Sequence, residues 1–283
     1  MSMIKGADEL RAHLPDFRRV LWQYVALTLA SACTGLGTML AFDYLPVLLP
    51  GQPFLQVIAP ITPLFGVSIV ELLEFSIVHR MWTKRKALLA TMKERAYQHG
   101  LRYICFGINL EYVVITRMFF PTPAFCEAGQ FLATPLLSFL PGGGPLSTII
   151  RVVAGLAIFG IGFALMFRAT TTFGLDYLLY LYLYFPEKSE IQRNQIYSIL
   201  RHPTYSSFIL MCFGAAITWF SVYSFLFFLI VLFRWGYHVR FVEDKELAER
   251  FGESYRRYRK EVPAFLVHPR HLRHFFKFLR GRG

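Results

Sequence analysis

The chain has 283 residues, of which 55% are hydrophobic and 17% are charged, and its formal net charge is +12. Soluble domains carry about 25% charged residues, so this composition argues against a soluble globular protein and predicts an integral membrane protein. The positive charge would suit nucleic acid in a soluble chain, but its distribution along this chain argues against that partner.

Apolar stretches taken in chain order predict about six membrane-spanning helices, because roughly 20 apolar residues cross a bilayer. The expected spans are residues 21–42, 55–79, 101–120, 147–168, 204–220 and 222–240. An amphipathic helix over residues 7–20, interfacial rather than a cleavable signal, precedes them. The shorter stretches 124–140 and 173–186 predict one or two interfacial or re-entrant helices. The expected fold is therefore an all-α polytopic transmembrane bundle.

Basic residues gather in four places: the N-terminus, the segment from Arg80 to Arg102, the segment from Arg168 to Arg201, and the tail after Arg234. Two spans or none separate each group from the next, so the positive-inside rule places all four groups, and both termini, on the cytoplasmic side. The same charges are expected to attract anionic lipids. No nucleic-acid partner is expected.

The clearest division of the chain is the run Pro141-Gly-Gly-Gly-Pro145. It predicts an N-terminal helical region over residues 1–145 and a C-terminal region over residues 146–283, which holds the polar motifs and a cytoplasmic helical tail broken at Pro263. The four cysteines are scattered without ligand spacing, so neither a disulfide framework nor a metal site is expected.

The run Arg201-His202-Pro203-Thr204-Tyr205 precedes the fifth predicted span. Pro203 suits the first turn of a helix, whose N-terminus offers free N–H groups and a positive dipole end to an anion. Arg201 and His202 would add further donors. The alternative is that these residues only flank a span, as arginine often does.

A second polar cluster follows the sixth predicted span. Arg240, Glu243 and Leu247 share one helical face, and Asp244 adjoins Glu243. Adjacent carboxylates near a membrane boundary are costly unless they are paired or used. The hairpin between the clusters would return both of them to one face of the bilayer. The alternative is an Arg240–Glu243 pair on a solvated surface.

The ordered motifs from Tyr197 to Pro263 resemble the isoprenylcysteine carboxyl methyltransferase and phospholipid methyltransferase family of integral-membrane enzymes. The matching residues are Tyr197, Arg201-His202-Pro203-x-Tyr205, Arg240-x-x-Glu243-Asp244-x-x-Leu247, Phe251-Gly252-Glu253-x-Tyr255-x-x-Tyr258 and Val262-Pro263. The resemblance covers roughly residues 150–265. Gln195 and Ser207 stand where the family has glycines, and Ser189 stands where prenylcysteine enzymes have histidine.

The resemblance implies that S-adenosylmethionine is held between the two clusters at the cytoplasmic side. Arg201, His202 and the helix that starts at Pro203 would suit its carboxylate, and Glu243 and Asp244 would suit its ammonium or ribose hydroxyls. The side chains that could pack on adenine are Tyr197, Tyr205, Tyr255 and Tyr258. The candidate catalytic residues are Arg234, Arg240 and Glu243.

The expected acceptor is a lipid or lipidated molecule, either a prenylcysteine-type carboxylate or a phospholipid amine. A carboxylate would need a cation such as Arg234, whereas an amine would need a base. Glu71 and Glu74, one turn apart, could hold the amine. Local pairing or interhelical hydrogen bonding is the alternative for these residues, as it is for Asn109 and Glu111.

Two other functions compete with the methyltransferase. Membrane sterol-type reductases, which use NADPH, also carry a His-Pro, but asparagine usually follows it and here Thr204 does. A non-catalytic membrane protein could also retain the fold. The expected location is a multi-pass position in a bacterial or archaeal plasma membrane, or in the endoplasmic reticulum of a eukaryote.

Overall fold

The computed structural model describes residues 5–14, 17–93, 95–139, 144–174, 176, 179–186 and 189–281. Within these ranges every regular element is a helix, and an isolated bridge between Pro135 and Ser221 is the only β contact. The predicted all-helical fold is confirmed. Most of the glycine run proposed as the division near residue 145 lies outside the described residues.

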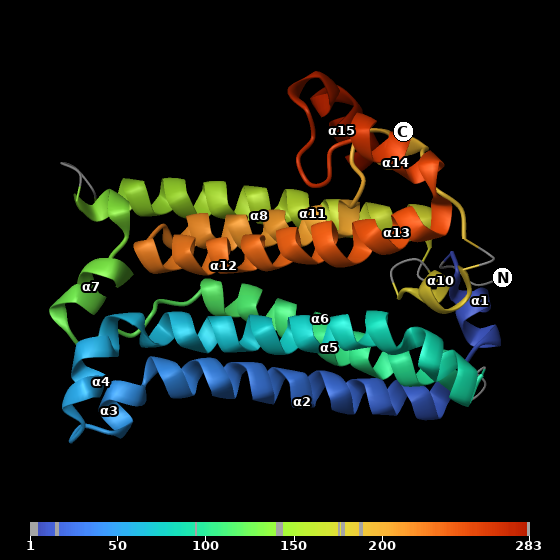
Figure 1. Cartoon of the computed structure of the whole chain (residues 1–283). Coiled ribbons are helices and arrows are strands. Elements are labelled where there is room, and N and C mark those ends of the chain that lie inside the picture. The colour runs from blue at the N-terminus through green and yellow to red at the C-terminus, as the bar shows by residue number, and fades with distance from the viewer. Residues whose placement is uncertain are drawn as a thin grey trace.

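The long helices form two groups of three (Figure 1). The first group contains α2 (Phe17–Asp43), α5 (Thr62–Met92) and α6 (Arg95–Met118). The second contains α8 (Pro145–Phe173), α11 (Pro203–Trp219) and α12 (Val222–His238). Contacts of α12 with α5, and of α11 with α6, join the groups around one apolar core.

Among the residues that the structure describes, four helical stretches are long and apolar enough to cross a membrane: Trp22–Asp43, Pro53–Met92, Pro145–Phe173 and Val222–Phe251. The other two predicted spans are also helical and lie inside the bundle as α6 and α11. Helix α11 has only 17 residues, and α6 contains the buried charges Glu111 and Arg117. Four of the six predicted spans therefore have the length and composition of a membrane crossing.

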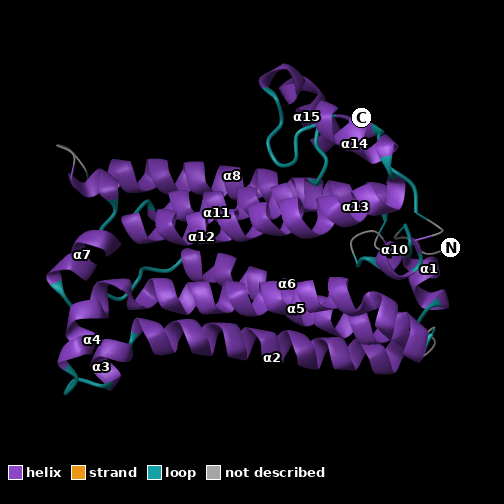
Figure 2. Cartoon of the chain, in the orientation of Figure 1, coloured by secondary structure: helices purple, strands orange, loops and turns teal. Residues whose placement is uncertain are grey.

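Short helices cover both ends of the bundle (Figure 2). One end carries α3 (Leu45–Leu48), α4 (Pro53–Ile58), η1 (Ala59–Ile61), α7 (Glu127–Ala133) and η2 (Leu136–Phe139). Toward the other end lie α1 (Ala7–Ala12), α10 (Leu181–Tyr184), η4 (Gln195–Ser198), α13 (Asp244–Phe251), α14 (Glu253–Glu261), η6 (Pro269–His271) and α15 (Leu272–Leu279). The described chain therefore begins and ends toward the same end, and that end also holds both polar clusters.

Close contact between α8 and α11 fixes where the first polar cluster begins. A Cβ atom added to Gly214 of α11 would lie 2.4 Å from the backbone nitrogen of Phe159 in α8, so only glycine allows this approach. At the end of the bundle that holds both polar clusters, Leu165 and Phe173 of α8 pack with Ile196 and Leu200. This packing holds the segment that leads into Arg201 against the bundle.

Candidate functional site

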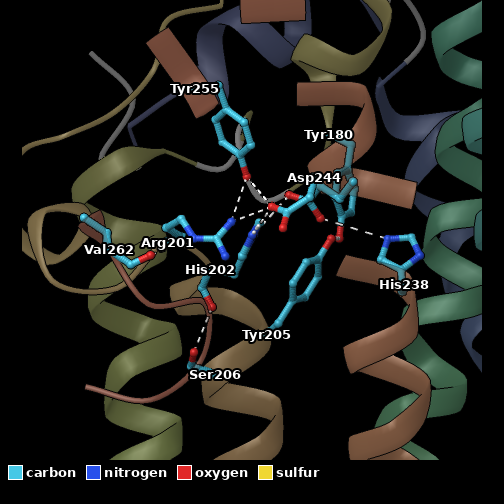
Figure 3. Close-up of polar contacts among 10 residues, drawn as sticks. Tyr180, Arg201, His202, Tyr205, Ser206, His238, Asp244, Tyr255 and Val262 are labelled. Atoms are coloured by element: carbon cyan, nitrogen blue, oxygen red, sulfur yellow. Dashed lines mark hydrogen bonds and ion pairs between the residues drawn. The ribbon is translucent and has the colours of Figure 1, made fainter. Parts of the chain in front are cut away.

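The α11–α12 hairpin brings the two polar clusters into direct contact (Figure 3). Arg201 precedes α11, and its Nη1 atom donates to Asp244 Oδ1 at 2.5 Å. Both side chains are at least nine-tenths buried. A buried ion pair of this kind is stable only when other hydrogen bonds satisfy the remaining polar atoms.

Residues from the C-terminal tail provide those additional bonds. The Tyr255 hydroxyl donates to Asp244 Oδ1, and Arg201 Nη1 lies 3.1 Å from the same hydroxyl. Arg201 Nε donates to the Val262 carbonyl at 2.8 Å. Burial raises the pKa of Tyr255 and the Asp244 carboxylate raises it further, so this phenol stays a donor at neutral pH.

His202 lies between the two acids. Its Nδ1 atom is 3.3 Å from Glu243 Oε1, and its Nε2 atom is 3.4 Å from Asp244 Oδ1. Burial alone would lower the pKa of His202, but the two carboxylates outweigh burial, and the pKa lies above its ordinary value. The site therefore favours an imidazolium facing two carboxylates.

A π-helical turn over Val239–Glu243 contains the first acid of the pair and ends just before Asp244. The wider turn changes the helical register immediately before Asp244, and such turns are frequent at functional sites. Arg240 lies within the same turn but is exposed, with its Cζ atom 5.6 Å from the centre of the Phe241 ring. Among the described ion pairs, Arg240 does not pair with Glu243. The surface pair considered from the sequence is absent there.

The four tyrosines proposed for the donor all border this cluster. Tyr205 stacks on His202 with ring centres 5.6 Å apart, and the Tyr258 hydroxyl donates to the Tyr197 carbonyl at 2.6 Å. The structure adds two aromatic residues that sequence reasoning missed. These are Trp235, which stacks on Tyr205 at 4.4 Å, and Tyr180, whose hydroxyl lies 3.0 Å from that of Tyr205. A tyrosine-rich stretch was the only signal of Tyr180.

Two cavities flank the Arg201–His202 segment. One, of about 70 Å³, is lined by Tyr180, Tyr197, Arg201, His202, Pro203, Thr204 and Tyr205. The other, of about 110 Å³, shares Tyr197, Arg201 and His202 and extends to Leu247, Phe251, Tyr255 and Tyr258. Pockets for ligands of nucleoside size measure about 300–1,000 Å³. A ligand of that size would have to join the two cavities and widen them.

The remaining predicted residues form a second buried cluster within the bundle. Arg234 Nε donates to Glu71 at 2.8 Å, and Arg234 Nη2 donates to Glu74 at 2.7 Å. Nη2 also donates to Glu111, which Cys212 contacts from α11. This arrangement is the interhelical pairing that the sequence analysis held as the alternative to acceptor binding.

The three carboxyl groups of this cluster have the spacing of a metal site. One oxygen each from Glu71, Glu74 and Glu111 lies within 4.8 Å of the others. The Arg234 guanidinium already binds all three of them, so a cation occupies the place that a metal would need. We therefore describe these residues as an ion-pair cluster.

Aromatic stacking connects this ion-pair cluster to the polar clusters around His202. The Arg234 guanidinium carbon lies 3.5 Å from the centre of the Trp235 ring, which is a cation–π contact. Trp235 stacks on Tyr205, and Tyr205 stacks on His202. Arg234, Trp235, Tyr205 and His202 therefore form one continuous series of ring contacts.

Comparison with known proteins supplies the family. Residues 150–254 match the family model described as phospholipid methyltransferase. This part of the chain is similar to phospholipid methyltransferases. The match contains both polar clusters and ends just before Tyr255, and it confirms the resemblance inferred from the motifs. Searches among curated proteins and among solved structures found no match.

The match and the four apolar helical stretches of the described residues are together what a membrane methyltransferase with lipid-type substrates would have. The match begins within α8 and ends within α14, and its two polar clusters meet at one end of the bundle. Glu71, Glu74 and Glu111 lie outside the matched residues.

Gln195 explains one departure from the family pattern. Its φ is +51°, in the left-handed region that favours glycine. A glycine at this position would adopt the same conformation without a Cβ atom, and this chain adopts it with a glutamine.

Gln195→Gly should raise the free energy of unfolding by about 0.5–1 kcal/mol. A residue with a Cβ in the left-handed region costs about 1–2 kcal/mol, and glycine removes that cost. Part of the stabilisation is lost because glycine has more conformational entropy in the unfolded state. Denaturant titration in detergent would measure the difference. Asn194→Gly is the control, since Asn194 has φ −94° and should gain nothing. Equal effects of the two variants would contradict the conformational explanation.

Arg234→Met should lower the free energy of unfolding by about 3–5 kcal/mol, because it leaves three buried carboxyl groups without their cation. Adding Glu71→Gln, Glu74→Gln and Glu111→Gln should recover much of the loss. The exposed Arg240→Met is the matched control and should change stability by less than about 0.5 kcal/mol. If Arg234→Met alone were as stable as the wild type, the pairing described here would be ruled out.

Proposed function

We propose that this protein is an S-adenosylmethionine-dependent methyltransferase that methylates a lipidic acceptor at the cytoplasmic face of its membrane. The observation that carries the proposal is the buried junction of the two polar clusters inside the matched methyltransferase domain. The proposal includes a multi-pass bundle with both termini cytoplasmic, as the distribution of basic residues predicts.

The residues of the junction fit the methyl donor chemically. The amino-acid end of the donor carries one ammonium and one carboxylate, so its pocket needs both signs of charge. Within the described residues, His202 Nε2 has only the 3.4 Å contact with Asp244, and Glu243 Oε2 has only the 4.0 Å contact with His238, so neither buried atom makes a well-formed hydrogen bond. One is a potential donor and the other an acceptor, so the junction retains unused binding capacity of both kinds.

Each side chain has a distinct part in holding the donor. Arg201, His202 and the first turn of α11 from Pro203 would bind the carboxylate, and Glu243 and Asp244 would bind the ammonium or ribose hydroxyls. The adenine would pack against the tyrosines that line the two cavities, namely Tyr197, Tyr205, Tyr255 and Tyr258. When bound, the donor supplies an electrophilic methyl group on a sulfonium.

A phospholipid amine is the acceptor that we favour. Arg234 is already bound to three carboxylates, so a carboxylate acceptor at Arg234 would add a fourth negative charge to a buried cluster. Glu71 and Glu74 are paired with Arg234 through one oxygen each, and the proposal assigns the ammonium to their other oxygens, which are buried and have no hydrogen-bond partner. Ser189 stands where prenylcysteine enzymes have histidine, which also favours an amine acceptor over a prenylcysteine carboxylate.

Proton removal is the chemical step that the protein must provide for such an acceptor. A lipid ammonium has no nucleophilic lone pair until it loses a proton. Glu243 is the proposed base, because it is the acid of the junction with an oxygen that makes no well-formed hydrogen bond. The exposed Arg240, in the same helical turn, is proposed to attract the lipid phosphate, and Arg234 is proposed to hold Glu71 and Glu74 in place.

Methyl-labelled donor should label a lipid pool when it is incubated with the detergent-solubilised protein. Two pools are offered, total lipid extract and a farnesylated cysteine analogue, and label is expected in the lipid amines. Glu243→Ala should lower the rate at least about 100-fold, since a positioned base contributes about 10²–10⁴. The exposed carboxylate variant Glu253→Ala should retain full activity.

Label in neither pool, with wild type equal to Glu243→Ala, would reject the proposed activity. Label confined to the farnesylated cysteine would reject the amine acceptor while retaining methyl transfer. Glu71→Ala should alter acceptor use without weakening donor binding, which separates the acceptor residues from the donor site.

A further inference from the structure

The C-terminal tail forms an open groove outside the donor site. The groove has a volume of about 640 Å³ and lies between the end of α14 and the turn η6. Its charged lining residues are Arg201, Arg259, Lys260, Arg270 and Glu261, together with His268 and His271. Arg201 is already paired with Asp244, so three further permanent cations and one carboxylate remain to meet a ligand, and the groove is large enough for a lipid headgroup.

The groove is bordered by exposed apolar side chains. Leu266 lines it and is 75% exposed, and Leu272 and Phe276 of the following helix α15 are also exposed. A soluble surface rarely combines cations with an exposed apolar rim, whereas a helix at the membrane interface uses both.

Helix α15 is fixed against the membrane bundle. Phe275 and Phe278 are buried in the cluster that contains Leu165 and Phe173 of α8. The Arg168 side chain of α8 donates to the Phe278 carbonyl at 3.2 Å. On helix α8, Phe163 and Phe167 are about 60% exposed, as lipid-facing residues are. Helix α15 lies beside α8 (Figure 1), so the groove that leads into α15 is held near these exposed apolar side chains.

We propose that this groove binds the phosphate of an anionic phospholipid, with Arg259, Lys260 and Arg270 around the phosphate and the acyl chains along Leu266 and α8. The charge complementarity and the apolar rim argue for a lipid rather than a soluble phosphate. The site rests on the proposed membrane position of the bundle, but it requires no methyl transfer.

The groove and the donor site share one wall. Val262 and Pro263 line the groove, and the carbonyls of Val262, Pro263 and Ala264 accept hydrogen bonds from Arg201 and His202. A lipid bound in the groove would brace this segment. Anionic lipid is therefore expected to tighten binding of the demethylated donor product.

Native mass spectrometry of the full-length protein in detergent, titrated with dioctanoyl phosphatidylglycerol, would test the site. Arg259→Gln combined with Arg270→Gln should weaken lipid binding about 30-fold, given the contribution of each cation near a lipid phosphate. The matched control is Arg257→Gln with Arg273→Gln, which removes two exposed arginines of the same tail outside the groove and should change affinity less than threefold. Leu266→Ser should weaken lipid binding but leave inorganic phosphate unaffected.

Equal losses in the two double variants would overturn the site, because attraction to overall positive charge would then explain the binding. Inorganic phosphate that binds as tightly as the lipid would also overturn it in favour of a soluble ligand. Lipid binding is measured without a methyl donor, so failure of the methyltransferase assay and failure of this site are separate results.

Discussion

The ion pair between Arg201 and Asp244 is the interaction on which the rest of the functional end depends. It joins residues 43 positions apart, across the whole α11–α12 hairpin. Buried charges of this kind need further hydrogen bonds to offset desolvation, and Tyr255 and Val262 supply them from the tail. The hairpin, the tail and the proposed donor site therefore fold as one unit.

A second buried charge cluster, inside the bundle, uses residues from both groups of helices. Arg234 of α12 binds Glu71 and Glu74 of α5, and Glu111 of α6 completes it. The first cluster lies inside the residues that match phospholipid methyltransferases, whereas these three acids lie before them. The N-terminal helices thus contribute charged groups to the core of the bundle, and the stacked rings of Trp235 and Tyr205 link the two clusters.

Much of the fold and part of the site could be predicted from the sequence. Two spans between Arg201 and Asp244 were enough to predict that the clusters share one end of the bundle, because each apolar crossing reverses the side of the chain. The π turn before Asp244 could not be predicted, since no residue type specifies it. The partners of Arg234 are set by packing among three helices, which helical periodicity within one segment does not reveal.

Binding of S-adenosylhomocysteine, the demethylated donor, tests most directly whether the junction of the two clusters is the donor site. Isothermal titration of the solubilised protein should show binding by the wild type and by the exposed control His274→Ala, which lies outside both the donor site and the groove. His202→Ala and Glu243→Ala should lose that binding, and NADPH should produce no heat. An absence of wild-type binding at millimolar concentration would contradict the account. Binding by His202→Ala and Glu243→Ala that equals wild-type binding, or binding of NADPH instead, would also contradict it.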